Sequence, residues 1–222
     1  MHFHTKTLLI ALFYLLGQSL HAQPMRYGII AGLQQSHPKD HAAMPGFHIG
    51  MKGEYSFTHD DSGAYIDVAA IISAKGWKDH ILNLGRGEDK DIPWNCHLYY
   101  LQMPIHIGYK TPVSDRVSII ADAGPYFAIG LYGKSKFDTD DDDFKSEIPN
   151  EYSENLFTNG TYKRFDMGVG AKIGIEIDHK VQIHIGYDLS IINPSKERWK
   201  ALLRKDRTAS VSVAYMLKHK AK

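Results

Sequence analysis

The sequence predicts an all-β protein: an eight-stranded antiparallel transmembrane β-barrel whose strands are joined as an up-and-down meander. Apolar residues alternate with polar residues or glycine in about eight segments, most strictly over residues 181–191. Each such segment is a strand with one apolar and one polar face. The segments follow an N-terminal stretch that has the form of a secretory signal. Because a closed sheet pairs every backbone N–H and C=O group inside lipid, this pattern is typical of a barrel wall.

The N-terminal stretch is the first element. His2, His4 and Lys6 precede an apolar segment at residues 8–16, and residues 17–22 give a polar, small-residue exit. We expect a signal peptide over residues 1–22, cleaved after Ala22, and an outer-membrane β-barrel domain over residues 23–222. The alternative of an uncleaved anchor is disfavoured because the apolar core is too short to cross about 30 Å of hydrocarbon as a helix.

The strands come next, each with an apolar face that we assign to lipid. They are expected at residues 25–34, 47–57, 65–75, 99–110, 117–131, 165–176, 181–191 and 208–217. The apolar faces of the first four are Met25, Tyr27, Ile29, Ala31 and Leu33; Phe47, Ile49, Met51, Tyr55 and Phe57; Ile66, Val68, Ala70, Ile72 and Ala74; and Tyr99, Leu101, Met103, Ile105, Ile107 and Tyr109. Those of the last four are Val117, Ile119, Ala121, Ala123, Phe127, Ile129 and Leu131; Phe165, Met167, Val169, Ala171, Ile173 and Ile175; Val181, Ile183, Ile185, Tyr187, Leu189 and Ile191; and Ala209, Val211, Val213, Tyr215 and Leu217.

The opposite faces carry glycines and charged residues. Charged residues that share their face with glycines include Lys52, Glu54, Asp67, Asp122, Asp166, Lys172, Glu176 and Asp188. A cation placed on the lipid side near the bilayer midplane costs about 2–4 kcal/mol, so we expect these faces to point inward. The interior of an eight-stranded barrel is only just wide enough for side chains. Salt bridges are therefore predicted to fill it, with a proton or ion path as the alternative.

The expected connections alternate in length. Residues 59–63, 111–115 and 178–180 are short and rich in turn formers, whereas the links after the first, third, fifth and seventh strands are long. Outer-membrane barrels have short periplasmic turns and longer external loops, so both termini are expected in the periplasm. Aromatic girdles are expected at the two ends of the wall. They comprise Tyr27, Tyr55, Phe57, Tyr109 and Tyr215 at the periplasmic end, and Phe47, Tyr99 and Phe165 at the outer end.

Composition limits the other classes. The chain has 222 residues, 23% of them charged, and a net charge of +1, which suits one domain and gives no nucleic-acid footprint. The body holds no apolar run of about 18 residues, which excludes a helical membrane protein. The single cysteine, Cys96, permits no intramolecular disulfide and matches no zinc-binding pattern, so we expect a free thiol near a strand end.

Four segments carry a family resemblance. They are residues 100–110 (YLQMPIHIGYK), 123–126 (AGPY), 165–174 (FDMGVGAKIG) and 185–193 (IGYDLSIIN). In their order and spacing they resemble the outer-membrane β-barrel domain of Bacteroidetes, often called PorT-like, over nearly all of the mature chain. The resemblance implies an outer-membrane barrel and carries over no catalytic motif. One departure is the basic tail at residues 218–222, because such barrels usually stop at an aromatic residue near the C-terminus.

No constellation in the sequence predicts a catalytic, cofactor or metal site. His48, His106 and His184 alternate with lipid-facing residues and are expected as ordinary polar groups of the lumen. The acidic run at Asp138 and residues 140–143 lacks the spacing of an EF-hand and is expected as solvated charge. A basic stretch could meet lipopolysaccharide phosphates or the acidic loop, or simply pack among the loops. It contains Lys196, Arg198, Trp199, Lys200, Arg204, Lys205 and Arg207.

The leading functional hypothesis is a small, monomeric, non-enzymatic barrel of the bacterial outer membrane. It would act as a structural or interaction protein in adhesion or assembly, without a cofactor. Its expected partners are membrane lipid, lipopolysaccharide, and a periplasmic or extracellular protein. The alternatives are a narrow transport barrel, an outer-membrane enzyme whose loops assemble a site, and a soluble lipocalin-like ligand-binding barrel with its apolar face inward.

Overall fold

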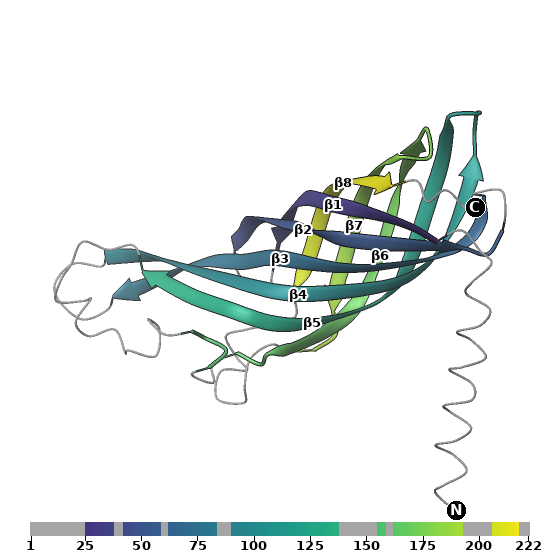
Figure 1. The fold of residues 1–222 in the computed structure, drawn as a ribbon. Helices are drawn as coiled ribbons and strands as arrows, with labels where there is room; N and C mark the ends of the chain where they lie inside the picture. The colour runs from purple at the N-terminus through teal and green to yellow at the C-terminus, as the bar shows by residue number, and fades with distance from the viewer. Residues whose placement is uncertain are drawn as a thin grey trace, which may run out of the picture.

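A computed structural model describes residues 25–37, 42–58, 62–83, 90–137, 155–158, 162–192 and 206–217. The described chain forms strands β1 (Met25–Ser36), β2 (Ala42–Ser56), β3 (Gly63–Asn83), β4 (Lys90–Pro112), β5 (Val117–Phe137), β6 (Phe165–Ile177), β7 (Val181–Ser190) and β8 (Arg207–Leu217). Each strand pairs antiparallel with its neighbours in sequence, and β8 pairs with β1 to close the barrel (Figure 1). The predicted fold is confirmed.

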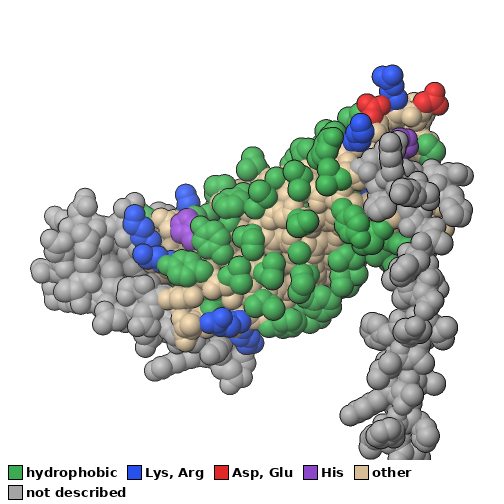
Figure 2. Space-filling model, viewed as in Figure 1, with side chains coloured by type: hydrophobic (Ala, Val, Ile, Leu, Met, Phe, Trp, Pro, Cys, Tyr) green, Lys and Arg blue, Asp and Glu red, His purple; other side chains and the backbone are tan. Residues whose placement is uncertain are grey.

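The two faces of the wall are inverted relative to a water-soluble protein. Leu33, Ile107 and Met51 are 73%, 69% and 67% exposed on the outside, whereas Glu54 and Lys110 are each 1% exposed in the interior. Figure 2 shows hydrophobic side chains spread over the visible outer wall. Burying charge while exposing such a large apolar area is unfavourable in water. The soluble lipocalin-like alternative is therefore wrong, and the alternating faces were assigned to the correct sides.

One lipid-face assignment differs in detail. Ala74 is only 9% exposed, although it lies on the outward side of β3. Its register partners are Phe47 on β2 and Tyr99 on β4, so its methyl group lies between two much larger side chains.

Within the described part of the chain, no helix is long and apolar enough to cross a membrane.

Three strands are longer than the sequence suggested. Pairing of β3 with β4 continues to Asn83 and Lys90, and pairing of β4 with β5 reaches Trp94 and Phe137. We call residues 75–83, 90–98 and 132–137 the β3–β5 extension. It projects beyond the remaining strands in Figure 1. The expected strand ends near residues 75, 99 and 131 were wrong because the extension lies beyond the apolar belt. Its described outward positions include Lys78, Asn95, His97, Lys134 and Lys136, so the alternation no longer marks a lipid face.

A β-bulge marks the base of the extension on β5. Tyr99 pairs with Tyr132, whereas the next residue, Tyr100, pairs with Gly130, which leaves Leu131 as an extra residue. Leu131 and Tyr132 are both exposed. Beyond the bulge the even-numbered residues of β5 face outward, so Lys134 and Lys136 are exposed while Ser135 is buried. Bulges of this kind bend a strand and re-aim its side chains.

The connections follow the expected alternation only in part. Short turns join β4 to β5 and β6 to β7, and Asp178 and His179 in the second turn adopt φ values of 50° and 55°. The links after β1 and β3, however, are reduced to residues 37–41 and 84–89, no longer than the link at residues 57–62. The expectation that both are long was wrong because strand pairing extends into them. The turns between β4 and β5 and between β6 and β7 lie at the same end of the barrel as Met25 and Leu217. We call this end the turn end, and the opposite end the extended end.

The orientation of the barrel gives the first prediction. In a Cys96→Ala background, Lys136→Cys at the extended end should react with a membrane-impermeant maleimide on whole cells. Ser114→Cys, in the turn between β4 and β5, should react only after the outer membrane is permeabilised. Labelling is read as a mass shift of the purified protein. Reaction at Ser114→Cys alone on intact cells would show that the barrel has the opposite orientation.

Candidate functional site

The lumen next to the turn end holds a closed ionic cluster, made by Arg26 of β1, Glu54 of β2, Lys110 of β4, Glu176 of β6 and Gln182 of β7. Lys110 Nζ lies 2.7 Å from Glu54 Oε1 and 2.9 Å from Glu176 Oε1. Arg26 Nη2 donates to Glu176 Oε2 at 2.7 Å and also to Glu54. Gln182 Nε2 donates to both carboxylates, at 2.8 and 2.6 Å. Two cations therefore neutralise two carboxylates across the barrel.

A second ionic layer follows towards the middle of the barrel. Lys52 Nζ lies 2.7 Å from Asp67 Oδ2, and Lys172 Nζ lies 3.3 Å from the same oxygen and 3.5 Å from Asp122 Oδ1. Asp122 also contacts His106 Nδ1 at 2.6 Å. Like the first layer, this one pairs two cations, here two lysines, with two carboxylates, here two aspartates. The predicted filling of the lumen by salt bridges is confirmed.

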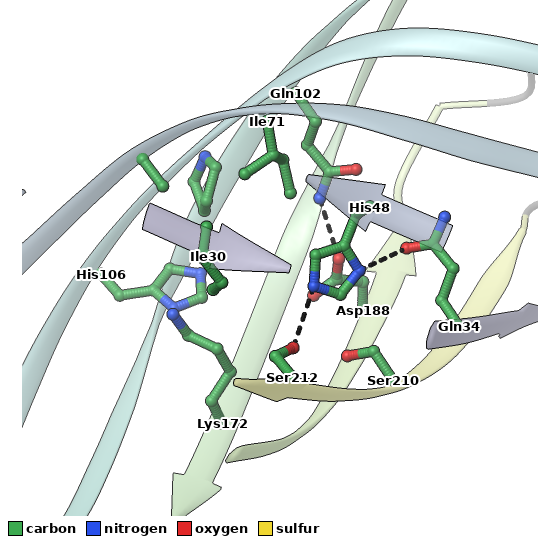
Figure 3. A pocket seen from close by; sticks show the side chains of 12 residues that line it. Ile30, Gln34, His48, Ile71, Gln102, His106, Lys172, Asp188, Ser210 and Ser212 are labelled. Carbon is green, nitrogen blue, oxygen red and sulfur yellow. Dashed lines mark hydrogen bonds between the residues drawn. The ribbon is translucent and has the colours of Figure 1, made fainter. Parts of the chain in front are cut away.

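Next to the second layer lies a small cavity of about 40 Å³ with both apolar and polar lining residues. His48 bridges its wall, with Nδ1 3.2 Å from Gln34 Oε1 and Nε2 2.9 Å from Ser212 Oγ (Figure 3). Gln102 Nε2 donates to Asp188 Oδ2 at 2.9 Å. Gln102 Oε1 and His106 Nε2 have no protein partner among the described residues. The cavity has room for about two or three water molecules, and these atoms can contact them.

The structure therefore brings the predicted lumen residues together inside the barrel. The segments for which loop roles were predicted are not among the described residues, apart from Arg207. His48, His106 and His184 are 5%, 2% and 1% exposed inside the barrel. No group of three or more His, Cys, Asp or Glu side chains in the described segments is placed to hold a metal ion. The signal at residues 1–22, the acidic run at 138–143, the basic stretch at 196–205 and the tail at 218–222 lie outside the described residues.

The ionic cluster gives the second prediction. Glu54→Gln should lower the free energy of unfolding in detergent by about 3 kcal/mol, because it leaves two buried cations sharing one carboxylate. The matched control is Asp178→Asn, which removes an exposed carboxylate 3.8 Å from Arg116 and should cost less than about 1 kcal/mol. Urea titration followed by tryptophan fluorescence measures both.

Adding Lys110→Met to Glu54→Gln should recover part of the lost stability, since one cation then faces one carboxylate. An equal loss in Glu54→Gln and Asp178→Asn would contradict the view that pairing in the lumen stabilises the barrel.

The β3–β5 extension has a core of its own. An apolar and aromatic cluster covers its inner side, formed by Trp77, Cys96, Leu98, Tyr100, Tyr126, Ala128, Leu156, Phe157 and Tyr162. Trp77 Nε1 donates to Tyr162 Oη at 2.8 Å, and Trp77 packs edge-to-face on Trp94 with ring centroids 4.6 Å apart. Cys96 is free and fully buried in this cluster. The expected free thiol is confirmed, but it lies well inside β4 rather than near its end, because β4 begins at Lys90.

A short segment after β5 folds back onto this core. Leu156 N donates to Gly133 O at 3.0 Å, and the Asn155 side chain accepts from Gly133 N at 3.1 Å. These bonds satisfy part of the free edge of β5 beyond β6. Leu156, Phe157 and Tyr162 were missed from the sequence; the available signal was three large apolar or aromatic residues within the otherwise polar segment 153–164.

Close contact with Gly130 gives the third prediction. A Cβ at this position would overlap the Phe157 ring, so Gly130→Ala should displace Phe157 at a cost of about 1–3 kcal/mol. Cleavage by chymotrypsin next to Phe157 in the folded protein should accelerate about tenfold. The control is Gly53→Ala, where the nearest atom is the flexible Met25 Cε at 3.3 Å. Unchanged cleavage in both variants would contradict this packing.

Comparison with known proteins identifies the family. The sequence matches the family described as outer membrane protein beta-barrel domain over residues 7–216. The chain belongs to this family. This outer membrane protein is thus a small eight-stranded barrel of the bacterial outer membrane, as its exposed apolar belt requires. No curated protein matches its sequence.

Several solved structures are similar to this outer membrane protein. Neisserial surface protein A has 11% identity and a TM-score of 0.45, covering 88% of this chain and 97% of its own. Ail, the attachment invasion locus protein of Yersinia pestis, has 16% identity and a TM-score of 0.40, covering 88% and 99%. The outer membrane enzyme PagL has 9% identity and a TM-score of 0.35, covering 86% and 97%.

Proposed function

We propose that this protein is a closed, non-enzymatic barrel that holds the β3–β5 extension outside the cell as a contact surface for adhesion or assembly. The observation that carries the proposal is the pairing of opposite charges in two layers across the lumen. Side chains from β1, β2, β4, β6 and β7 meet in the ionic cluster, and Arg26, Glu54, Lys110, Glu176 and Gln182 are each at most 5% exposed.

A solute would have to break this cluster to pass. Separating the partners of a buried ion pair costs several kcal/mol, since each charge is left without its partner. Two such layers lie in series, and Lys52 Nζ connects them by donating to Gln182 Oε1 at 2.6 Å. This arrangement favours a structural barrel over the narrow transport barrel.

The β3–β5 extension supports the proposed contact surface at the extended end of the barrel. Its three strands remain paired beyond the lipid-facing belt and are backed by the aromatic cluster. A platform of this kind holds its outward side chains in fixed positions, which reduces the conformational entropy lost when a partner binds. The inner side is already covered by Leu156, Phe157 and Tyr162, so the outward side is the contact surface.

Other parts of the proposal concern the precursor and the lineage. We propose export with cleavage after Ala22, a mature barrel over residues 23–222, and action as a monomer that needs no cofactor. The segments at residues 100–110 and 165–174 support a PorT-like protein of the Bacteroidetes.

Planar-bilayer recordings test the closed lumen and give the fourth prediction. The native protein should show no stable single-channel currents, because both ionic layers block the lumen. A variant in which Arg26, Glu54, Lys110 and Glu176 are all alanine should stay closed, since the second layer remains. Adding alanine at Lys52, Asp67, Asp122 and Lys172 should give measurable conductance, since both layers are then removed. Large, stable currents from the native protein would replace this proposal with the transport barrel.

A further inference from the structure

The two ends of the barrel differ in the signs of their exposed charges. At the turn end the signs are mixed, with Asp115, Arg116, Asp178 and Lys180 exposed. At the extended end, every exposed Asp, Glu, Lys, Arg or His side chain that the structure describes is basic. These side chains are His37, Lys78, His97, Lys134, Lys136, Arg164 and Arg207. Figure 2 shows blue and purple side chains without red ones at this end, and both blue and red at the other.

Four of these residues lie side by side on β3, β4 and β5. We call them the basic row: Lys78, His97, Lys134 and Lys136. His97 of β4 pairs directly with Lys134 of β5, and Asn95 of β4 pairs with both Lys78 of β3 and Lys136 of β5. Neighbouring strands are about 4.8 Å apart, so Lys78 and Lys136 start only about 10 Å from each other. Flexible lysine side chains at this spacing can reach a single anionic group.

The basic row lies directly beyond the lipid-facing belt. On β4 the belt runs from Tyr99 to Tyr109, with an apolar side chain at every second residue, and this length suits one crossing of the hydrocarbon. Tyr99 and Tyr132 pack with ring centroids 6.4 Å apart at the border, where aromatic residues meet the headgroups. At about 3.4 Å per residue, Lys134 lies only about 7 Å beyond Tyr132. The row is therefore level with lipid headgroups.

The row is electrostatically unfavourable without an anion. Like charges on adjacent or nearly adjacent strand positions repel one another. Partial burial, and then the ammonium groups of Lys78 and Lys136, lower the pKa of His97, which lies outside the lipid-facing belt. A phosphate placed between the lysines would relieve this repulsion and form charge-assisted hydrogen bonds.

We infer that the basic row binds the phosphate groups of lipid A in the outer leaflet. Lipid A is the anionic glycolipid that faces the extended end in the proposed orientation, and it presents its phosphates at headgroup level. The inference depends on that orientation but not on a closed lumen, so channel activity would leave it unchanged. It also explains why the one-sign surface lies at this end only.

The fifth prediction concerns the affinity for lipid A. Binding of fluorescent lipid A is measured for the detergent-solubilised native protein and for two variants that each lose two positive charges. Lys134→Gln/Lys136→Gln should bind at least about tenfold more weakly, since two cationic contacts with the anionic headgroups are lost. The control, Arg116→Gln/Lys180→Gln at the turn end, should bind as the native protein does. A gel shift on boiling checks that each variant is folded.

Two further probes separate the sources of anionic charge. Lipid A stripped of its phosphates and vesicles of phosphatidylglycerol should both bind more weakly than intact lipid A. Equal affinity for phosphatidylglycerol, or equal losses in the two variants, would overturn the inference. So would a native protein that binds lipid A only after residues 138–143 are neutralised, because the acidic run would then be the natural partner of the lysines.

Discussion

The exclusion of water from the wall is the constraint on which this structure depends. A chain in hydrocarbon must pair its backbone groups internally, and closure of β8 onto β1 achieves this without a free edge. Closure then sends alternate side chains into a narrow interior. Charges in that interior must find partners, and the ionic cluster shows how they do so, with Lys110 and Arg26 each contacting both Glu54 and Glu176. The same contacts connect strands that are not neighbours in the sheet.

The wall could be predicted from the sequence because its two faces obey one rule over its whole height. Ile183, Ile185 and Tyr187 meet lipid, while Gln182 and His184 are buried in the lumen, so reading every second residue was enough. The extension could not be predicted in this way. There Lys78 and His97 face outward and Trp77 and Leu98 face inward, which reverses the rule at the membrane border. A pattern that reverses within a strand resembles the end of that strand.

The lumen charges could be assigned to a face but not to their partners. Which side chains meet across a barrel depends on strand stagger, and the alternation of residues carries no information about stagger. Arg26 and Lys110 lie on the polar faces expected for the first and fourth strands, but their shared partner Glu176 could not be predicted. Only the closed sheet brings both of them to Glu176, which is far away in sequence. The contact between Phe157 and Gly130 depends likewise on where a loop returns.

The bulge at Leu131 restricts how the β3–β5 extension could be transplanted onto another barrel of this kind. Because one extra residue inverts the sidedness of β5, the lower part of the strand sends odd-numbered residues outward and the upper part sends even-numbered ones. Removing that residue would turn Lys134 and Lys136 towards Leu98 and Phe157 and expose the inner face. An extension transplanted onto another barrel must therefore keep the parity of residue numbers across the border. At the membrane border, only insertions or deletions of an even number of residues keep each side chain on its own face of the sheet. In the loops beyond the strands, this requirement does not restrict the length of an insertion or deletion.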